Sequence, residues 1–261
     1  MKILAALAAI AALCASALAY NPVPATKSAA EAELNAALDH ATSDSAKLKI
    51  AEDALNAHPD DILVGRAAEA IILKFDGDPV TYFKTRAEKS GTVAAHYLYG
   101  DISGRAMGDS VVPAEEANWI LKKDPNNFWA HMLLGDAEWN KGKPDLALVQ
   151  QDYEAAISAD PSQPDGYLYL GWAFEDAEKW PEARAAFDAG AVADPSNKMI
   201  TEQRLTTYAQ LHDGAAYLNL AKTVFPDTPL SLDLFRANRE GKVTTADLLG
   251  KTTVIEYWAF T

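Results

Sequence analysis

Cysteine is nearly absent from this chain. Its 261 residues include one cysteine, Cys14. Because one thiol cannot close a disulfide within the chain, the fold cannot depend on a disulfide framework. Thiol-disulfide exchange needs an attacking thiolate and a second cysteine that resolves the mixed disulfide, and the sequence has no Cys-x-x-Cys pair. The sequence therefore predicts no such catalysis for the chain as given.

Basic residues are also scarce. The chain carries 23 lysines and arginines against 37 aspartates and glutamates, a formal net charge of −14 at pH 7. A protein that binds nucleic acid neutralises phosphates with lysine and arginine, and a protein that binds an anionic membrane surface needs the same charges. The charge balance therefore opposes both kinds of partner.

Only one apolar run is long, from residue 3 to residue 13, and it is too short to span a bilayer. Lys2 precedes it and a small-x-small Ala-Leu-Ala sequence follows it, so residues 1–19 have the pattern of a secretory signal peptide. A retained helix or membrane anchor is the alternative. We expect cleavage before Tyr20, loss of the single cysteine with the signal, and a periplasmic or secreted protein. Two prolines predict an extended linker over residues 20–28.

No pattern of a metal or cofactor site is visible. The histidines include no pair at the helix spacing of metal ligands, and no glycine-rich phosphate loop is present. We therefore expect no metal, no cofactor and no catalytic residue, and we interpret the histidines as surface or packing residues. They are His40, His58, His96, His131 and His212.

The centre of the chain repeats itself. A Leu-Gly pair that ends at Gly135 returns 36 residues later at Gly171. An Asp-Pro pair closes each copy, and Pro161 and Pro195 are 34 residues apart. This interval is typical of a repeat built from two helices. We expect the small residues to lie where two helices approach closely and aromatic residues to fill the gaps between turns.

These copies resemble the tetratricopeptide repeat. The residues that carry the resemblance are Gly135, Tyr153, Ala156 and Pro161 in the first copy and Tyr167, Leu170, Gly171, Phe174, Ala183, Phe187, Gly190 and Pro195 in the second. Gly190 departs from the usual alanine but keeps the small size, at a cost of about 1 kcal/mol of helix stability. The resemblance implies an all-α fold of stacked helical hairpins that form a superhelical solenoid. An ordinary helical bundle with a coincidental period is the alternative.

Weaker copies extend the pattern to about six helical hairpins over residues 29–225. The clearest repeats cover residues 128–161 and 164–195. Ser28 and Glu31 have the spacing of a capping box at the start of the first helix. Further helices are expected at residues 47–58, 61–75, 80–89, 113–123, 196–210 and 213–224.

Two expectations about these helices are specific. Residues 61–75 and 80–89 should pair as one hairpin, separated by an Asp-Gly-Asp-Pro turn. Pro113 should occupy the first position of the helix at 113–123. A backbone N–H at that position has no partner within the helix, so proline loses no hydrogen bond there.

The first helices of stacked hairpins line the concave face of such an array. Projection from the packed positions places eight residues on that face: Tyr97, Asp101, Trp129, Met132, Asp136, Asp165, Leu168 and Trp172. The face is acidic and aromatic, which favours an extended peptide with basic and apolar side chains. We therefore predict a protein-binding scaffold, although the tryptophans are also typical of a packed core.

The character of the sequence changes over residues 229–261, where the last part is rich in β-branched and aromatic residues. This stretch resembles the opening of a thioredoxin-like redoxin domain, as in thiol-disulfide oxidoreductases and thiol-specific antioxidant proteins. The residues that carry the resemblance are Gly250, Lys251, Tyr257, Trp258 and Ala259. In that family a Cys-x-x-Cys follows at once. A C-terminal β-hairpin that packs on the last repeat is the alternative.

The resemblance implies a second function. We expect residues 229–261 to be the N-terminal fragment of a thioredoxin-like domain, and the chain to be the first portion of a longer protein. On this interpretation the chain as given binds, and a full-length form is a thiol-disulfide oxidoreductase.

Overall fold

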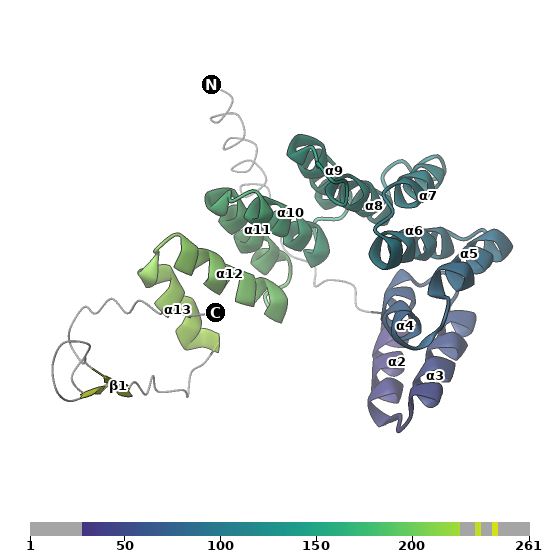
Figure 1. Ribbon diagram of the computed structural model, residues 1–261, viewed down its shortest axis with the longest axis horizontal. Coiled ribbons are helices and arrows are strands. Elements are labelled where there is room, and N and C mark those ends of the chain that lie inside the picture. The colour runs from purple at the N-terminus through teal and green to yellow at the C-terminus, as the bar shows by residue number, and fades with distance from the viewer. Residues whose placement is uncertain (1–27, 225–232, 236–241, 245–261) are drawn as a thin grey trace. The chain divides into compact units, whose positions relative to one another are not determined.

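The computed structural model describes residues 28–224, 233–235 and 242–244. The elements are α2 (Ala29–His40), α3 (Asp44–Ala57), α4 (Ile62–Phe75), α5 (Pro79–Ser90), α6 (Val93–Met107), α7 (Val111–Leu121), α8 (Phe128–Trp139), α9 (Leu146–Ala159), α10 (Pro164–Asp176), α11 (Trp180–Ala193), α12 (Lys198–Gln210), α13 (Gly214–Val224), β1 (Asp233–Phe235) and β2 (Lys242–Thr244) (Figure 1). The chain divides into two compact units, Met1–Asp213 and Gly214–Thr261. The expected helical fold is confirmed.

Side-chain caps explain where many of the helices begin. Ser28 accepts a hydrogen bond of 3.2 Å from the backbone N–H of Glu31, as the capping pattern predicts. Asn127 accepts one of 3.1 Å from Ala130 at the start of α8, and Asn197 caps α12 in the same way. These polar residues stand before apolar helical stretches, so the boundaries are largely readable from the sequence.

The helix expected at 113–123 begins earlier, at Val111. Asp109 is the reason, because its carboxylate accepts the N–H groups of Val111 at 2.7 Å and Val112 at 3.3 Å. Pro113 therefore lies third in α7 rather than first. The proline is still within the first turn, where its missing N–H removes no intrahelical hydrogen bond.

Helices that follow one another in the chain pack side by side. Within hairpins, α6 packs on α7, α8 on α9, and α10 on α11; between hairpins, α7 packs on α8, α9 on α10, and α11 on α12 (Figure 1). First helices of neighbouring hairpins also meet, as α4 and α6 do. This is the stacking that the repeat interval predicts.

The two helices at residues 61–75 and 80–89, which were expected to pair as one hairpin, pack mainly on other helices. α4 packs mainly on α2, α3 and α6, whereas α5 packs mainly on α6. Arg86 of α5 donates to the carbonyl oxygen of Leu55 and to Asn56 Oδ1 at the end of α3, the latter at 2.9 Å. A groove of about 830 Å³ lies between α3 and α5. The polar contacts of α5 are thus directed to α3, and the expected pairing with α4 is not the main one.

Glycines allow the helices of the two clearest hairpins to touch. A Cβ atom at Gly171 would overlap the ring of Phe187, and one at Gly135 would overlap the ring of Tyr153. Both rings are completely buried. The ten non-proline residues that carry the repeat resemblance are all buried, and the two prolines lie in the turns. These contacts and this burial are what the packing interpretation of the pattern expects.

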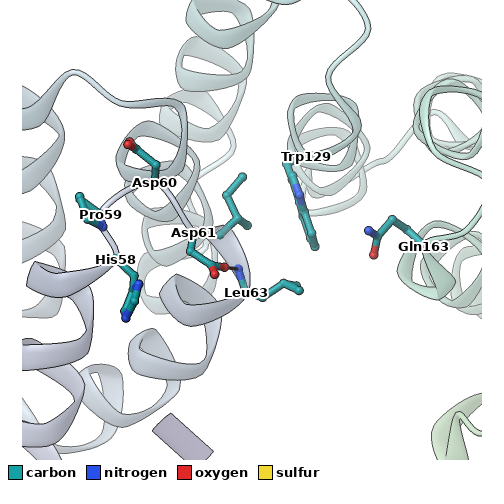
Figure 2. A pocket seen from close by; sticks show the side chains of 8 residues that line it. His58, Pro59, Asp60, Asp61, Leu63, Trp129 and Gln163 are labelled. Carbon is teal, nitrogen blue, oxygen red and sulfur yellow. Dashed lines mark hydrogen bonds between the residues drawn. The ribbon is translucent and has the colours of Figure 1, made fainter. Parts of the chain in front are cut away.

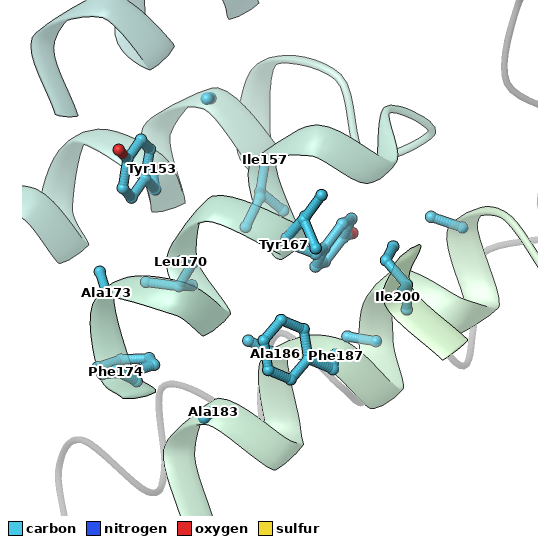
Figure 3. Packing of buried hydrophobic residues seen from close by; sticks show 14 of the residues in the cluster. Tyr153, Ile157, Tyr167, Leu170, Ala173, Phe174, Ala183, Ala186, Phe187 and Ile200 are labelled. Carbon is cyan, nitrogen blue, oxygen red and sulfur yellow. The ribbon is translucent and has the colours of Figure 1, made fainter. Parts of the chain in front are cut away.

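The same close packing explains why glycine stands at position 190 instead of the usual alanine. A Cβ atom there would lie 2.9 Å from Tyr167 Cβ and 2.9 Å from Ile200 Cδ1. Figure 3 shows Tyr167, Phe187 and Ile200 gathered between the helices of this core. Because Tyr167 Cβ is attached directly to the backbone, it cannot move aside easily. The lost helix propensity of glycine is therefore the cost of a closer helix contact.

The second unit holds α13, β1 and β2. No residue of α13 is buried, and Leu218 is 58% exposed. The strands pair antiparallel, with Leu234 opposite Val243. The expected signal peptide, most of the linker, and the redoxin-like residues Gly250, Lys251, Tyr257, Trp258 and Ala259 lie outside the described residues.

We predict that Gly171→Ala lowers the free energy of unfolding by about 1–3 kcal/mol, because the new methyl group must displace Phe187 or separate α10 from α11. Gly142→Ala is the matched control, since nothing lies within 4 Å of a Cβ atom at that turn position. Urea unfolding followed by circular dichroism measures both. Equal midpoints for the two variants would contradict the packing argument.

Candidate functional site

The first helices of four successive hairpins each carry one residue at the same position of the repeat. The residues that directly follow the packed glycines of α4, α6, α8 and α10 are Arg66, Asp101, Asp136 and Trp172. The charges of the first three are close enough to influence one another. The equivalent positions therefore hold one cation, two acids and an indole.

The eight residues predicted for the concave face divide into two groups. Tyr97, Asp101, Met132 and Leu168 are buried, and Trp129, Asp136, Asp165 and Trp172 are partly buried. The rings of Tyr97 and Trp129 meet, with their centroids 5.1 Å apart, and the buried group packs inside the helical array. A ligand at the present surface can reach only the partly buried group.

Arg66 connects helices that are far apart in the sequence. Its guanidinium forms an ion pair with Asp165 at the start of α10, 99 residues further along the chain. Its guanidinium carbon also lies 5.0 Å from the ring centroid of Trp129 on α8. We call Trp129 and Asp165 the guanidinium site. Trp129 packs against both hydrophobic cores of the first unit, so this site lies where the cores meet.

A second arginine lies beside a buried pair of acids. Arg105 Nη1 is 3.1 Å from Asp101 Oδ2 and 3.4 Å from Glu69 Oε2. Glu69 is fully buried, and its Oε1 atom has no hydrogen-bond partner among the described residues. Burial and the neighbouring Asp101 raise the pKa of Glu69 well above its ordinary value. Glu69 therefore binds a proton more tightly than an exposed glutamate.

Asp136 also has an altered pKa. Burial is the largest cause and raises the pKa of Asp136 to about 7. The Tyr153 hydroxyl donates a hydrogen bond of 2.5 Å to Asp136 Oδ1 and opposes this rise, whereas nearby Asp101 reinforces it. Arg66 also lowers the pKa of Asp136, but by less than burial raises it. The carboxyl group of Asp136 thus titrates near neutral pH.

An open pocket of about 650 Å³ lies next to the guanidinium site. Figure 2 shows Trp129 standing between the segment from His58 to Leu63 and Gln163. Asp60 on its rim is exposed, and Gln163 precedes α10 without a side-chain cap hydrogen bond. The volume is in the range of pockets that bind small molecules or several peptide side chains.

The described residues contain no cluster of three or more histidine, cysteine, aspartate or glutamate side chains arranged to hold a metal ion. Across the same part of the chain, every helix is too short or too polar to cross a membrane. The guanidinium site offers charge pairing with Asp165 and contact with the aromatic ring of Trp129.

Sequence reasoning missed Arg66, Glu69 and Arg105. A signal for Arg66 was present, because Gly65 lies 35 residues before Gly100 and continues the glycine interval. Extending the repeat by one unit would have put Arg66 at the position of Asp101. No local pattern indicates Glu69 or Arg105, which become partners only through packing of α4 on α6.

Comparison with known proteins supports the fold. PilW, described as a widely conserved type IV pilus biogenesis factor, has a TM-score of 0.51 at 16% identity, over 78% of this chain and 96% of PilW. TTC0263, a thermophilic TPR protein from Thermus thermophilus, has a TM-score of 0.48 at 13% identity, over 72% and 93% of the two chains. No family model and no curated protein matches the sequence. The stacked hairpins and the likeness to PilW thus agree with a tetratricopeptide-like helical array.

We predict that the first unit is more stable at about pH 5 than at about pH 8. Asp136 binds its proton more tightly when folded, so folding takes up a proton between its ordinary pKa of 3.8 and about 7. The free energy of unfolding therefore falls as the pH rises through this window, by about 1–3 kcal/mol. Glu69 acts in the same direction. Urea midpoints at the two pH values measure the change.

Asp136→Asn should flatten this pH dependence, because the amide resembles the protonated carboxyl group and cannot titrate. Four ionisable groups influence Asp136: Tyr153, Asp101, Arg66 and Asp165. Asp53→Asn is the control, since that carboxylate is exposed on α3 and pairs with Lys49. An unchanged slope in Asp136→Asn would show that another group carries the proton.

Proposed function

We propose that this protein is an exported scaffold that binds a basic and apolar segment of another protein on the inner face of its helical array. The observation that carries the proposal is the set of partly buried acidic and aromatic side chains on α8 and α10. Stacked helical hairpins present such faces to extended ligands. An acidic face with indole rings attracts cations by charge and by stacking.

The available contact residues are Trp129, Asp136, Asp165 and Trp172, since the other predicted contacts are buried. Trp172 lies 5.3 Å from Tyr169, ring centroid to centroid, and these rings form an aromatic surface on α10. Apolar side chains of a partner fit this surface, and its basic side chains fit the carboxylates. The excess of acidic residues in the whole chain supports the same polarity of partner.

Export is supported by the N-terminal sequence. A lysine, an apolar run and a small-x-small site precede Tyr20 in the order of a secretory signal peptide. We propose that the mature chain begins at Tyr20 and acts in the periplasm or outside the cell. Mass spectrometry of the protein from cell fractions tests this, and an intact N-terminus in the cytoplasmic fraction would contradict it.

The binding proposal predicts a preference that peptides can test. Fluorescence anisotropy should show tighter binding of a labelled peptide of alternating arginine and leucine than of its glutamate and leucine counterpart. Trp172→Ala should weaken binding of the basic peptide by about tenfold, because it removes part of the aromatic surface. Trp119→Ala is the matched control, a partly buried tryptophan on the second helix α7.

Equal affinity for the two peptides would contradict the proposed charge preference. Loss of binding in Trp119→Ala as large as in Trp172→Ala would show that the effect comes from stability. Circular dichroism of each variant separates these two cases.

A second candidate is favoured by residues 248–261 alone. Their match to the opening of a thioredoxin-like domain supports a longer form in which the repeats hold a substrate for a thiol-disulfide oxidoreductase. Sequencing the gene beyond the codon for Thr261 tests this. A stop codon with no cysteine-coding continuation would remove the candidate. The chain as given should show no reduction of insulin disulfides, since it has no Cys-x-x-Cys.

A further inference from the structure

The guanidinium site of Trp129 and Asp165 already contains an arginine, and that arginine belongs to the chain itself. Arg66 reaches this site from α4, while Trp129 is on α8 and Asp165 on α10. The ion pair and the stacking distance of 5.0 Å together satisfy both the charge and the flat face of the guanidinium. The site therefore accommodates an arginine side chain.

The site is not sealed. The side chain of Arg66 is 29% exposed and that of Asp165 is 21% exposed. The pocket of about 650 Å³ opens along Trp129, and its rim carries Asp60, so a chain approaching from there meets acidic groups first. A partner side chain can thus reach Trp129 without unfolding a helix.

We propose that the guanidinium site binds an arginine side chain of the partner, and that Arg66 is an internal occupant which this arginine displaces. This inference rests on the proposed binding function and names the ligand class. While Arg66 holds the site, α4 remains joined to α8 and α10. A partner arginine can bind only after the ion pair between Arg66 and Asp165 is broken. The apparent affinity of the intact protein for the partner is therefore reduced.

Arginine fits this site better than lysine does. A guanidinium is planar and can stack on the Trp129 indole while it donates hydrogen bonds to Asp165. A lysine ammonium is a compact, strongly hydrated charge and lacks the flat face. The site therefore distinguishes two basic side chains that the net charge of the protein would attract equally.

The test uses Arg66→Ala in the full chain. The probe is a fluorescein-labelled peptide of alternating arginine and leucine, with a lysine and leucine peptide for comparison. Emptying the site should increase affinity for the arginine peptide by about tenfold over the wild-type chain, with a smaller gain for the lysine peptide. Adding Asp165→Asn to Arg66→Ala should abolish the gain.

Arg184→Ala is the matched control. Arg184 lies 4.9 Å from the Tyr208 ring and 2.8 Å from Asp213, so it resembles Arg66 in chemistry but lies at the contact of α11 with α12. Its side chain is 36% exposed, close to the value for Arg66. This variant should bind the arginine peptide as the wild-type chain does.

Four outcomes are distinguishable when circular dichroism shows that each variant is folded. A gain in Arg66→Ala alone supports the inference. Equal binding by the wild-type chain and Arg66→Ala overturns the self-occupied site but leaves the binding function standing. An equal gain in Arg184→Ala also overturns it. No binding by any variant overturns both proposals.

Arg66→Lys serves if Arg66→Ala fails to fold. It keeps the positive charge and the ion pair but weakens stacking on Trp129, so it should bind the arginine peptide about threefold more tightly than the wild-type chain. Affinity equal to the wild-type value in this variant would overturn the inference.

Discussion

The close contact between helices at the repeated glycines is the constraint on which the first unit depends. Gly135 and Gly171 leave room for the rings of Tyr153 and Phe187, and a methyl group at either position would overlap the ring. The distance between paired helices is therefore set by the glycine and the aromatic ring together. Once that distance is set, the residue that directly follows the glycine in each first helix has a defined direction. Asp136 and Trp172 directly follow these glycines and so occupy equivalent positions on α8 and α10.

The same constraint places ionisable groups in surroundings that a surface would not provide. Asp136 is one residue from a buried glycine, so its carboxyl group is poorly hydrated and its pKa rises to about 7. The partners of these groups come from other helices. Tyr153 hydrogen-bonds to Asp136 from α9, and Arg105 of α6 pairs with the buried Glu69 of α4. Packing of the repeats thus produces both a stable array and a titratable inner face.

In the proposed binding mode, ligand binding and the stability of this array are connected through Arg66. Arg66 stabilises the present arrangement of α4, α8 and α10 by an ion pair and by stacking on Trp129. The same two groups are those a basic partner would use. A binding site that is filled by the protein itself favours partners that offer several contacts at once, because a single weak contact cannot displace the internal one.

The sequence by itself determined the helical repeat. The interval of its glycines and prolines, the cap at Ser28, and the alternation of small and aromatic residues are local features, and helix formation depends on such features. Features of the fold that depend on a single polar contact were harder to predict from the sequence. The start of α7 depends on Asp109, and the position of α5 depends on Arg86, neither of which has a distinctive pattern.

Only the tertiary structure decided which inner-face residues are available. Tyr97 and Trp129 have the same character in sequence, yet Tyr97 is 3% exposed and Trp129 remains partly exposed beside a pocket. Arg66 and Asp165 are 99 residues apart, and nothing local connects them. Exposure and long-range pairing depend on how far each hairpin turns relative to the previous one. That rotation is the sum of many small packing contacts, and no single stretch of sequence specifies it.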